Sequence, residues 1–191
     1  MVAADRAPRR YVQSVNPARI RPATLSDVPA LSDLATRTWA DAFGEGLSSD
    51  DEAAEVKDSR SERYFADALR GKTILVAESD RRLVGYVQFG GVEIGEVDIQ
   101  PGDRGLHRLY VETALQGRGL GRRLMEAALG HPQLAEAERI FLQVWDENER
   151  AVRLYESFGF RRVGATTFTV GVERMEDAVF VLEKRNRPGR P

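Results

Sequence analysis

A glycine-rich turn between a strand pattern and a helix pattern constrains this chain more than any other feature. The turn reads Gln116-Gly117-Arg118-Gly119-Leu120-Gly121. It follows an apolar strand pattern that ends at Val111, and it opens an amphipathic helix. The first N–H groups of a helix lack backbone partners and carry the positive end of the helix dipole, and glycines let a ligand come close to them. The turn therefore predicts a site for an anion, most often a phosphate.

Two nucleotide-binding motifs do not fit this turn. A mononucleotide P-loop requires a lysine directly after its last glycine, whereas Arg122 follows Gly121. The dinucleotide fingerprint Gly-x-Gly-x-x-Gly fails in both registers, because its third glycine would fall at Arg122 or Leu124. The pattern that remains is Gln/Arg-x-x-Gly-x-Gly/Ala, which Gln116, Gly119 and Gly121 satisfy.

A second motif lies downstream and reads Asn-Glu-Arg-Ala-Val-Arg-Leu-Tyr-Glu-Ser-Phe-Gly-Phe from Asn148 to Phe160. Together the two motifs resemble the GNAT superfamily of acetyl-CoA-dependent N-acetyltransferases, over residues 18–184. The resemblance implies a single α/β (α+β) domain. Its central sheet would be mixed and mostly antiparallel, with flanking helices and two strands splayed at the cofactor cleft.

The order of patterns along the chain agrees with one such domain. We expect a flexible N-terminal arm over 1–17, an N-acetyltransferase domain over 18–185 and a C-terminal tail over 186–191. Ser26 or Asp27 is expected to cap the first helix. The other expected elements are a helix at 61–69, a hairpin at 73–78 and 83–89, an ambiguous extended stretch at 92–99, strands at 106–111 and 139–144, a helix at 148–158 and a hairpin at 163–170 and 179–184.

Composition excludes several classes of protein. The net charge of −2 argues against a general nucleic-acid binder, and no apolar run approaches the roughly 20 residues of a membrane span. With no secretory signal pattern, we expect a cytoplasmic protein. The chain has no cysteine, which excludes disulfides, thiolate metal sites and an acyl-cysteine intermediate. Two histidines argue against a histidine-rich metal centre, so we expect no metal and direct transfer from the cofactor.

The resemblance implies that acetyl-CoA is the co-substrate and that two segments hold it. Backbone groups of the 109–111 strand would pair with the pantetheine arm, and the glycine turn would bind the pyrophosphate. Arg118 and Arg122 would add positive charge, or they are solvated arginines at a helix end. Asn148 would hydrogen-bond the pantetheine or cap its helix, where Asp146 and Glu149 offer a competing capping box. The implied cofactor residues are Leu109, Tyr110, Val111, Gln116, Gly117, Arg118, Gly119, Leu120, Gly121, Arg122 and Asn148.

The resemblance also assigns the chemistry. Tyr155 would donate a proton or hydrogen bond to the departing thiolate, although its place on an apolar helix stripe equally fits a core tyrosine. A backbone N–H near Val111 would stabilise the developing oxyanion. The general base is left unassigned. Its candidates are Glu96, Asp98, His107 and Glu112.

The acceptor is predicted from a closer resemblance to the Pai-type bacterial spermidine/spermine N-acetyltransferases. It rests on the strings at 39–43, 106–111, 144–148 and 164–168 and implies a polyamine. Six acids and no lysine or arginine lie between Trp39 and Glu55, so Trp39, Phe43 and Asp51 are predicted substrate residues, unless 41–55 is only a solvated loop. Protein N-termini, amino acids and antibiotic amines remain alternatives, as does a non-catalytic acyl-CoA-binding regulatory module. By analogy we expect a possible homodimer.

Overall fold

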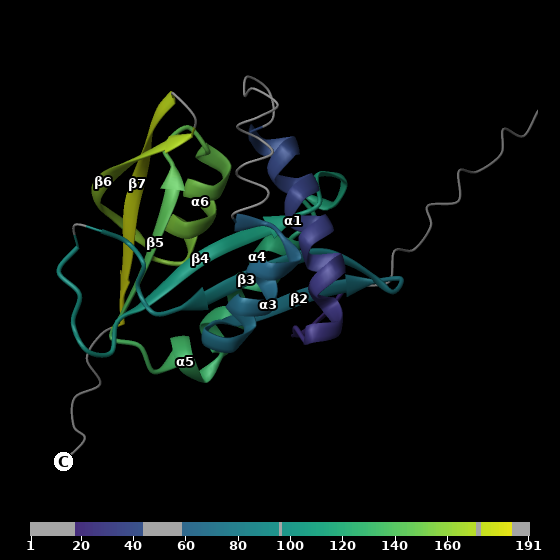
Figure 1. Ribbon diagram of the computed structural model, residues 1–191. Helices are drawn as coiled ribbons and strands as arrows, with labels where there is room; N and C mark the ends of the chain where they lie inside the picture. The colour runs from purple at the N-terminus through teal and green to yellow at the C-terminus, as the bar shows by residue number, and fades with distance from the viewer. Residues whose placement is uncertain (1–17, 44–58, 96, 171–172, 185–191) are drawn as a thin grey trace, which may run out of the picture.

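One mixed sheet organises the fold. The computed structural model describes residues 18–43, 59–95, 97–170 and 173–184. Within these ranges a seven-stranded sheet has the order β1-β2-β3-β4-β5-β7-β6 (Figure 1). The strands are β1 Arg19–Pro22, β2 Thr73–Ser79, β3 Arg82–Gly90, β4 Arg104–Val111, β5 Arg139–Trp145, β6 Arg161–Val170 and β7 Glu173–Glu183. Only β4 and β5 are parallel, which confirms the predicted mixed, mostly antiparallel sheet.

Helices cover both faces of the sheet. They are η1 Leu25–Asp27, α1 Val28–Phe43, α3 Glu62–Gly71, η2 Thr113–Leu115, α4 Leu120–Gly130, α5 Pro132–Ala135 and α6 Glu149–Ser157. Side chains of β2 show how one strand serves two layers: Leu75 and Ala77 pack on the side of α4 and α6, whereas Ile74 and Val76 pack against α1 and α3. Because both faces of the strand are buried, its sequence is a continuous apolar run instead of an alternating one.

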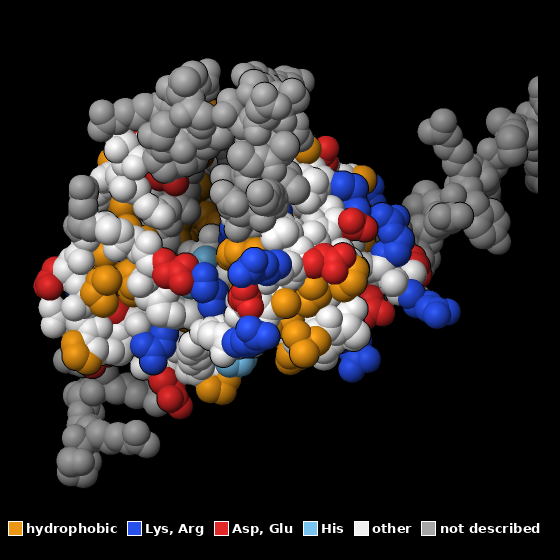
Figure 2. Space-filling view, in the orientation of Figure 1, with side chains coloured by type: hydrophobic (Ala, Val, Ile, Leu, Met, Phe, Trp, Pro, Cys, Tyr) orange, Lys and Arg blue, Asp and Glu red, His pale blue; other side chains and the backbone are white. Residues whose placement is uncertain are grey.

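The face that carries α1 and α3 has no separation of charge among the described residues. Figure 2 shows lysine and arginine side chains interspersed with aspartate and glutamate across it. No helix of the described ranges is both long enough and apolar enough to cross a bilayer.

The ambiguous stretch between β3 and β4 forms neither strand nor helix in its described residues. Ile94 is buried against Phe141 and Val179, so this stretch covers one face of β5 and β7. At its end Asp103, only 4% exposed, accepts a 2.6 Å ion-pair contact from Arg139 at the start of β5. A second ion pair joins Glu93 of the stretch to Lys72 at 2.7 Å. The stretch is therefore held by packing and by ion pairs with distant residues, neither of which has a local sequence period.

Two expected boundaries are wrong. Thr24 stands at the N-cap of η1, and Asp27 fills the acidic position three residues later, where its carboxylate accepts a 2.8 Å bond from the Thr24 N–H. The last strand begins at Glu173 and not at 179, and Glu173 pairs with Val170. The early part of β7 is polar, so an apolar alternation cannot reveal it. The helix predicted at 61–69 is confirmed as α3, with the Ser61 hydroxyl accepting from the Tyr64 N–H.

The expected arm over 1–17 and tail over 186–191 lie outside the described residues. The domain limits at 18 and 185 therefore stay predictions.

Candidate active site

The parallel strands β4 and β5 meet only at their first residues. Their pairing is confined to Arg104 with Ile140 and Gly105 with Phe141, after which the two strands diverge (Figure 1). The Glu112 N–H donates to the Val84 carbonyl oxygen of β3 at 3.0 Å. Because successive residues of a strand direct their backbone groups to opposite sides, those of Leu109 and Val111 face the β5 side, and those of Tyr110 face β3. The described fold therefore leaves backbone groups of β4 available where the resemblance implies splayed strands.

The glycine turn lies at the end of β4 and forms the start of α4. Gly117 has φ +76° and Gly119 has φ +82°, a left-handed conformation that favours glycine. Gly119 is the N-cap of α4, and a Cβ built on it would meet nothing within 4 Å. The start of α4 therefore has open space beside Gly119, and a site for a phosphate at a helix N-terminus requires such space.

Gln116 joins this turn to two other elements. Its Nε2 donates to the Val111 carbonyl oxygen at 3.0 Å, and its Oε1 accepts from Arg150 Nη1 of α6 at 2.7 Å. The Arg150 Nη2 lies 3.7 Å from the position that a Cβ on Gly117 would occupy. Sequence reasoning missed Arg150 as a site residue, although it sits within the second motif. The structure adds it as a cation beside the turn.

The two predicted arginines of the turn differ in their surroundings. Arg118 is exposed within the turn itself. Arg122 donates from Nη2 to Ser157 Oγ at 2.8 Å, and its guanidinium lies 4.9 Å from the ring centroid of Phe158. Arg122 therefore ties α4 to the end of α6, which agrees with the helix-end alternative. Contact of either arginine with the cofactor stays a prediction.

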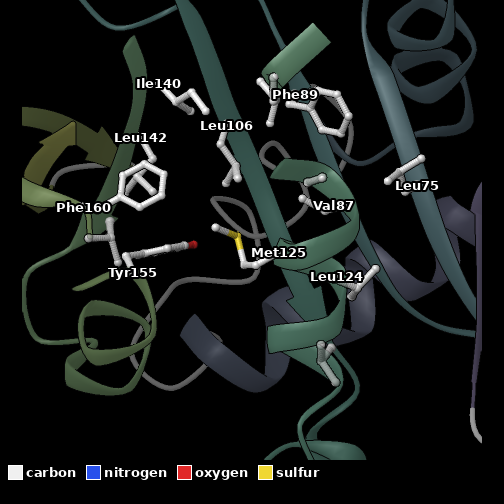
Figure 3. Close-up of a cluster of buried hydrophobic side chains, with 14 of the residues drawn as sticks. Leu75, Val87, Phe89, Leu106, Leu124, Met125, Ile140, Leu142, Tyr155 and Phe160 are labelled. Atoms are coloured by element: carbon white, nitrogen blue, oxygen red, sulfur yellow. The ribbon is translucent and has the colours of Figure 1, made fainter. Parts of the chain in front are cut away.

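Tyr155 is a core residue whose hydroxyl points from α6 toward α4. Its side chain is 6% exposed and packs edge-on against Phe160, with 5.9 Å between ring centroids. Figure 3 shows the hydroxyl pointing away from Phe160 and toward Met125 of α4. Burial raises the pKa of Tyr155, with a further contribution from Tyr110. The phenol therefore stays protonated at neutral pH, as a proton donor must.

Asn148 caps α6. Its Oδ1 accepts from the Ala151 N–H at 3.1 Å, so the cap alternative is the one that the structure shows. The competing capping box does not form, since Asp146 instead accepts from Arg162 at 3.0 Å. A hydrogen bond from Asn148 to the pantetheine stays a prediction.

The structure does not single out one of the four candidate bases that the sequence offers. Glu112 accepts from Arg37 at 3.1 Å and from Arg82 at 3.2 Å. His107 Nε2 lies 2.7 Å from the Gly91 carbonyl oxygen, and burial lowers the pKa of this imidazole. Asp98 is an exposed carboxylate that accepts from Gln100, and Glu96 lies outside the described residues. No base is assigned from this set.

Asp177 is a half-buried carboxylate that sequence reasoning did not single out. It lies on β7 opposite Trp145, at the end of β5 that has diverged from β4. Burial raises its pKa from the ordinary 3.8 to about 6. No motif or period marks this residue, because its burial arises from strand pairing.

The predicted acceptor residues are only partly described. Trp39 is buried in α1, and the Arg60 guanidinium lies 4.6 Å from its ring centroid. Phe43 ends α1, but its side chain lies outside the described residues, as does all of Asp51. Asp41 accepts from Thr113 Oγ1 at 2.7 Å, so this acid of the 41–55 segment holds α1 to η2. Substrate contacts of Trp39, Phe43 and Asp51 stay predictions.

The described residues contain no group of three or more histidine and acidic side chains placed to bind a metal ion.

Comparison with known proteins agrees with this geometry. The model of the acetyltransferase (GNAT) family matches residues 31–160, more than half of the chain. An uncharacterized N-acetyltransferase of Lactobacillus delbrueckii subsp. lactis is 28% identical over 160 residues, which cover 83% of this chain and 91% of that protein. The fold is similar to that of the PaiA N-acetyltransferase from Thermoplasma acidophilum, solved in complex with coenzyme A. The TM-score is 0.70 at 17% identity, covering 87% of this chain and 99% of that one.

The closer resemblance to polyamine enzymes is supported over part of the chain only. The spermine/spermidine N(1)-acetyltransferase of Bacillus subtilis is 33% identical over 87 residues, which cover 45% of this chain and 57% of that enzyme. That match supports the acetyltransferase assignment and leaves the acceptor open. With its splayed strands, glycine turn and matched family model, the chain belongs to the acetyltransferase (GNAT) family and is an acetyl-CoA-dependent N-acetyltransferase.

Proposed function

We propose that this protein transfers the acetyl group of acetyl-CoA to a primary amine of a small acceptor by direct attack in a ternary complex. One observation carries the proposal: the separation of β4 from β5, with the glycine turn on one side and Tyr155 on the other. The absence of cysteine from the chain supports direct transfer, since no thiol is present to hold the acetyl group.

The residues around the gap fit a long, anionic co-substrate. Backbone groups of Leu109 and the N–H of Val111, whose carbonyl oxygen already accepts from Gln116, would hold the pantetheine arm as an added strand. The N–H groups at the start of α4 would hold the diphosphate, with Arg150 and Arg118 supplying positive charge. Open space beside Gly119 supports this assignment, because a side chain there would occupy the approach.

Protein groups would protonate the departing sulfur and stabilise the oxyanion during acetyl transfer. A bond forms between the amine nitrogen and the acetyl carbon, and the carbon–sulfur bond breaks. Tyr155 gives its proton to the departing sulfur and regains one from solvent, while the amine loses its proton to water. A backbone N–H near Val111 stabilises the negative charge that develops on the acetyl oxygen.

A polyamine is the finer prediction for the acceptor. It is supported by the partial match to the Bacillus subtilis enzyme and by the acidic composition of 41–55. Amino acids and peptide N-termini are the competing acceptors.

The test is a thiol-release assay with acetyl-CoA and a panel of polyamines, amino acids and peptides. Release that depends on one class of amine is the expected result, with an acetylated amine formed in equal amount. No release from any member of the panel would overturn the proposal.

A further inference from the structure

Four side chains share one patch of the sheet on the face of α1 and α3. Gln88 of β3 pairs in register with Arg108 of β4, and the next pair on the same face is Tyr86 with Tyr110, whose rings stack with 5.6 Å between centroids. Tyr64 of α3 covers the patch: its hydroxyl accepts from Gln88 Nε2 at 2.8 Å. The patch therefore gathers polar groups beneath a helix, next to the strand end at which we place the reaction.

Arg108 has no carboxylate partner among the described residues of this patch. Its Nη1 donates to the Ser59 carbonyl oxygen at 2.6 Å, and its guanidinium lies 4.4 Å from the ring centroid of Tyr64. No acid of the described residues lies within ion-pair distance of it, in contrast to Arg21 and Arg139, which hold Asp27 and Asp103.

The guanidinium of Arg108 nevertheless stays charged. Burial disfavours the charged form, but the hydroxyls of Tyr86, Tyr64 and Tyr110 outweigh it and raise the pKa above its ordinary value. A partly buried cation without an anion is costly, because neither water nor a counter-ion fully compensates it. The described part of the patch therefore supplies no negative charge to Arg108.

Two more polar atoms of the patch lack partners. The Tyr86 hydroxyl and Gln88 Oε1 are buried and meet no hydrogen-bond partner at good geometry among the described residues. The Tyr86 hydroxyl lies beside the Arg108 guanidinium, and the side chains of Tyr86 and Gln88 are both 0% exposed. Such atoms are rare in folded proteins and usually mark a group that is filled by a ligand or a water. The Tyr86 hydroxyl can donate to an anion, whereas Gln88 Oε1 can accept an N–H from the same molecule.

We infer that Arg108 and Tyr86 bind a carboxylate of the acceptor while Gln88 Oε1 accepts an N–H from the same molecule, so that the acceptor is an amino acid or a similar amine bearing a carboxylate. This inference rests on the proposed acetyl transfer and names its substrate class. A guanidinium and a hydroxyl both donate to carboxylate oxygens, and the pairing with arginine can be bidentate. A polyamine would instead leave Arg108 unpaired and add like charge beside it.

The position of Arg108 suits a short acceptor. Two residues of strand separate it from Tyr110 on the same face, a rise of about 6–7 Å. Tyr110 is close enough to Tyr155 to influence its pKa, and Val111 follows directly. An amine a few bonds away from a carboxylate at Arg108 would therefore reach the strand end where the acetyl group is transferred.

The experiment compares amino acids with their decarboxylated amines in the thiol-release assay on the full chain. The pairs are lysine with cadaverine, ornithine with putrescine and alanine with ethylamine, with spermidine added. We expect kcat/KM to be roughly tenfold to a hundredfold higher for the member with the α-carboxylate. Equal values, or a preference for cadaverine, putrescine or spermidine, would overturn the inference while leaving acetyl transfer established.

Variants test whether the preference for the α-carboxylate depends on Arg108. Arg108→Gln should remove the preference for the α-carboxylate and leave the KM for acetyl-CoA unchanged, and Arg108→Lys should restore only part of it, because an ammonium lacks the planar fork. Arg82→Gln, at an exposed arginine of β3, should behave as wild type. An equal loss for both members of every pair in Arg108→Gln would contradict recognition of the carboxylate.

A binding measurement separates failure of the inference from failure of the proposed function. If no acceptor releases thiol, calorimetry with glycine and with methylamine, in the presence of coenzyme A, still tests Arg108. Glycine should bind at least tenfold more tightly than methylamine to the wild type and not to Arg108→Gln. Equal binding of the two ligands to the wild type would overturn the inference independently of catalysis.

Discussion

Gln116 donates a 3.0 Å hydrogen bond from its Nε2 to the carbonyl oxygen of Val111, and so fixes the glycine turn to the end of β4. The same amide accepts from Arg150, which extends the link to α6. Three elements that are distant in the sequence are thereby held around the start of α4. The geometry of the anion site depends on this link as much as on the glycines.

Arg150→Ala should weaken coenzyme A binding by about three- to tenfold, because it removes a cation beside the turn and the restraint on Gln116. Calorimetry at low and high salt measures this loss, which should shrink as salt screens the charge. Arg153→Ala, also on α6 and paired with Glu149, is the matched control and should bind normally. Equal losses in both variants would contradict a specific role for Arg150.

Gly119→Ala should reduce coenzyme A affinity by about tenfold or more, since its Cβ would stand in the open approach to the α4 N-terminus. The left-handed backbone there should also cost about 1 kcal/mol of folding free energy. Gly130→Ala, at the other end of α4 in equally open space, should leave affinity unchanged. Binding by calorimetry and unfolding by urea separate the two effects, and normal affinity in Gly119→Ala would remove the turn from the site.

Tyr155→Phe should lower kcat by about 10²-fold or more while coenzyme A affinity stays the same, because only the proton donor is lost. Thiol-release kinetics and calorimetry give the two quantities. Removal of one hydroxyl from the packed ring should leave the melting temperature nearly unchanged, which guards against a folding artefact. A variant with unaltered kcat would show that Tyr155 serves the core alone.

Asp177→Asn should stabilise the protein at about pH 7. Its folded pKa of about 6 exceeds the ordinary 3.8, so the native state binds more protons than the unfolded state between these values. Stability therefore falls as pH rises from about 4 to about 6, and the ionised carboxylate costs about 1–2 kcal/mol above that window. Urea unfolding at about pH 4 and about pH 7 should show a gain for the variant only at the higher pH.

Asp27→Asn provides the contrast with opposite sign. Hydrogen bonds from Arg21 and Thr24 outweigh burial and hold the Asp27 pKa at about 2, so its stabilisation is present above 3.8 and is lost as pH falls toward 2. This variant should be less stable than wild type at about pH 7, by about 1–2 kcal/mol. A gain for Asp27→Asn or a loss for Asp177→Asn at that pH would contradict the assigned shifts.

Patterns among neighbouring residues predict the glycine turn and the second motif, but they do not predict contacts between segments that are distant in the sequence. The turn from Gln116 to Gly121 was found because glycine spacing and helix amphipathicity are properties of neighbouring residues. The partner of Gln116 on α6 could not be found in this way, since Arg150 approaches it only in the folded chain. The start of β7 at Glu173 was missed because its polar residues show no apolar alternation.

The residues proposed to bind the acceptor also could not be predicted from local sequence patterns. Arg108, Tyr86 and Gln88 have no common motif, and strand register alone places them on one face. Nothing in the sequence distinguishes Arg108 from other charged residues, whereas the structure places it on the Ser59 carbonyl oxygen and beside the Tyr64 ring. Asp177 likewise acquires its altered pKa from burial that its sequence neighbours do not reveal.

The short contact between β4 and β5 leaves the sheet as two half-sheets whose backbones pair at one end only, while a shared core joins their side chains. A pantetheine arm bound between them, with its polar groups paired to Leu109 and Val111, would connect the two half-sheets and stabilise their relative position. Acetyl-CoA would then stabilise the same arrangement of strands that binds it. Coenzyme A would make these contacts without the acetyl group, so the stabilisation would last until coenzyme A dissociates.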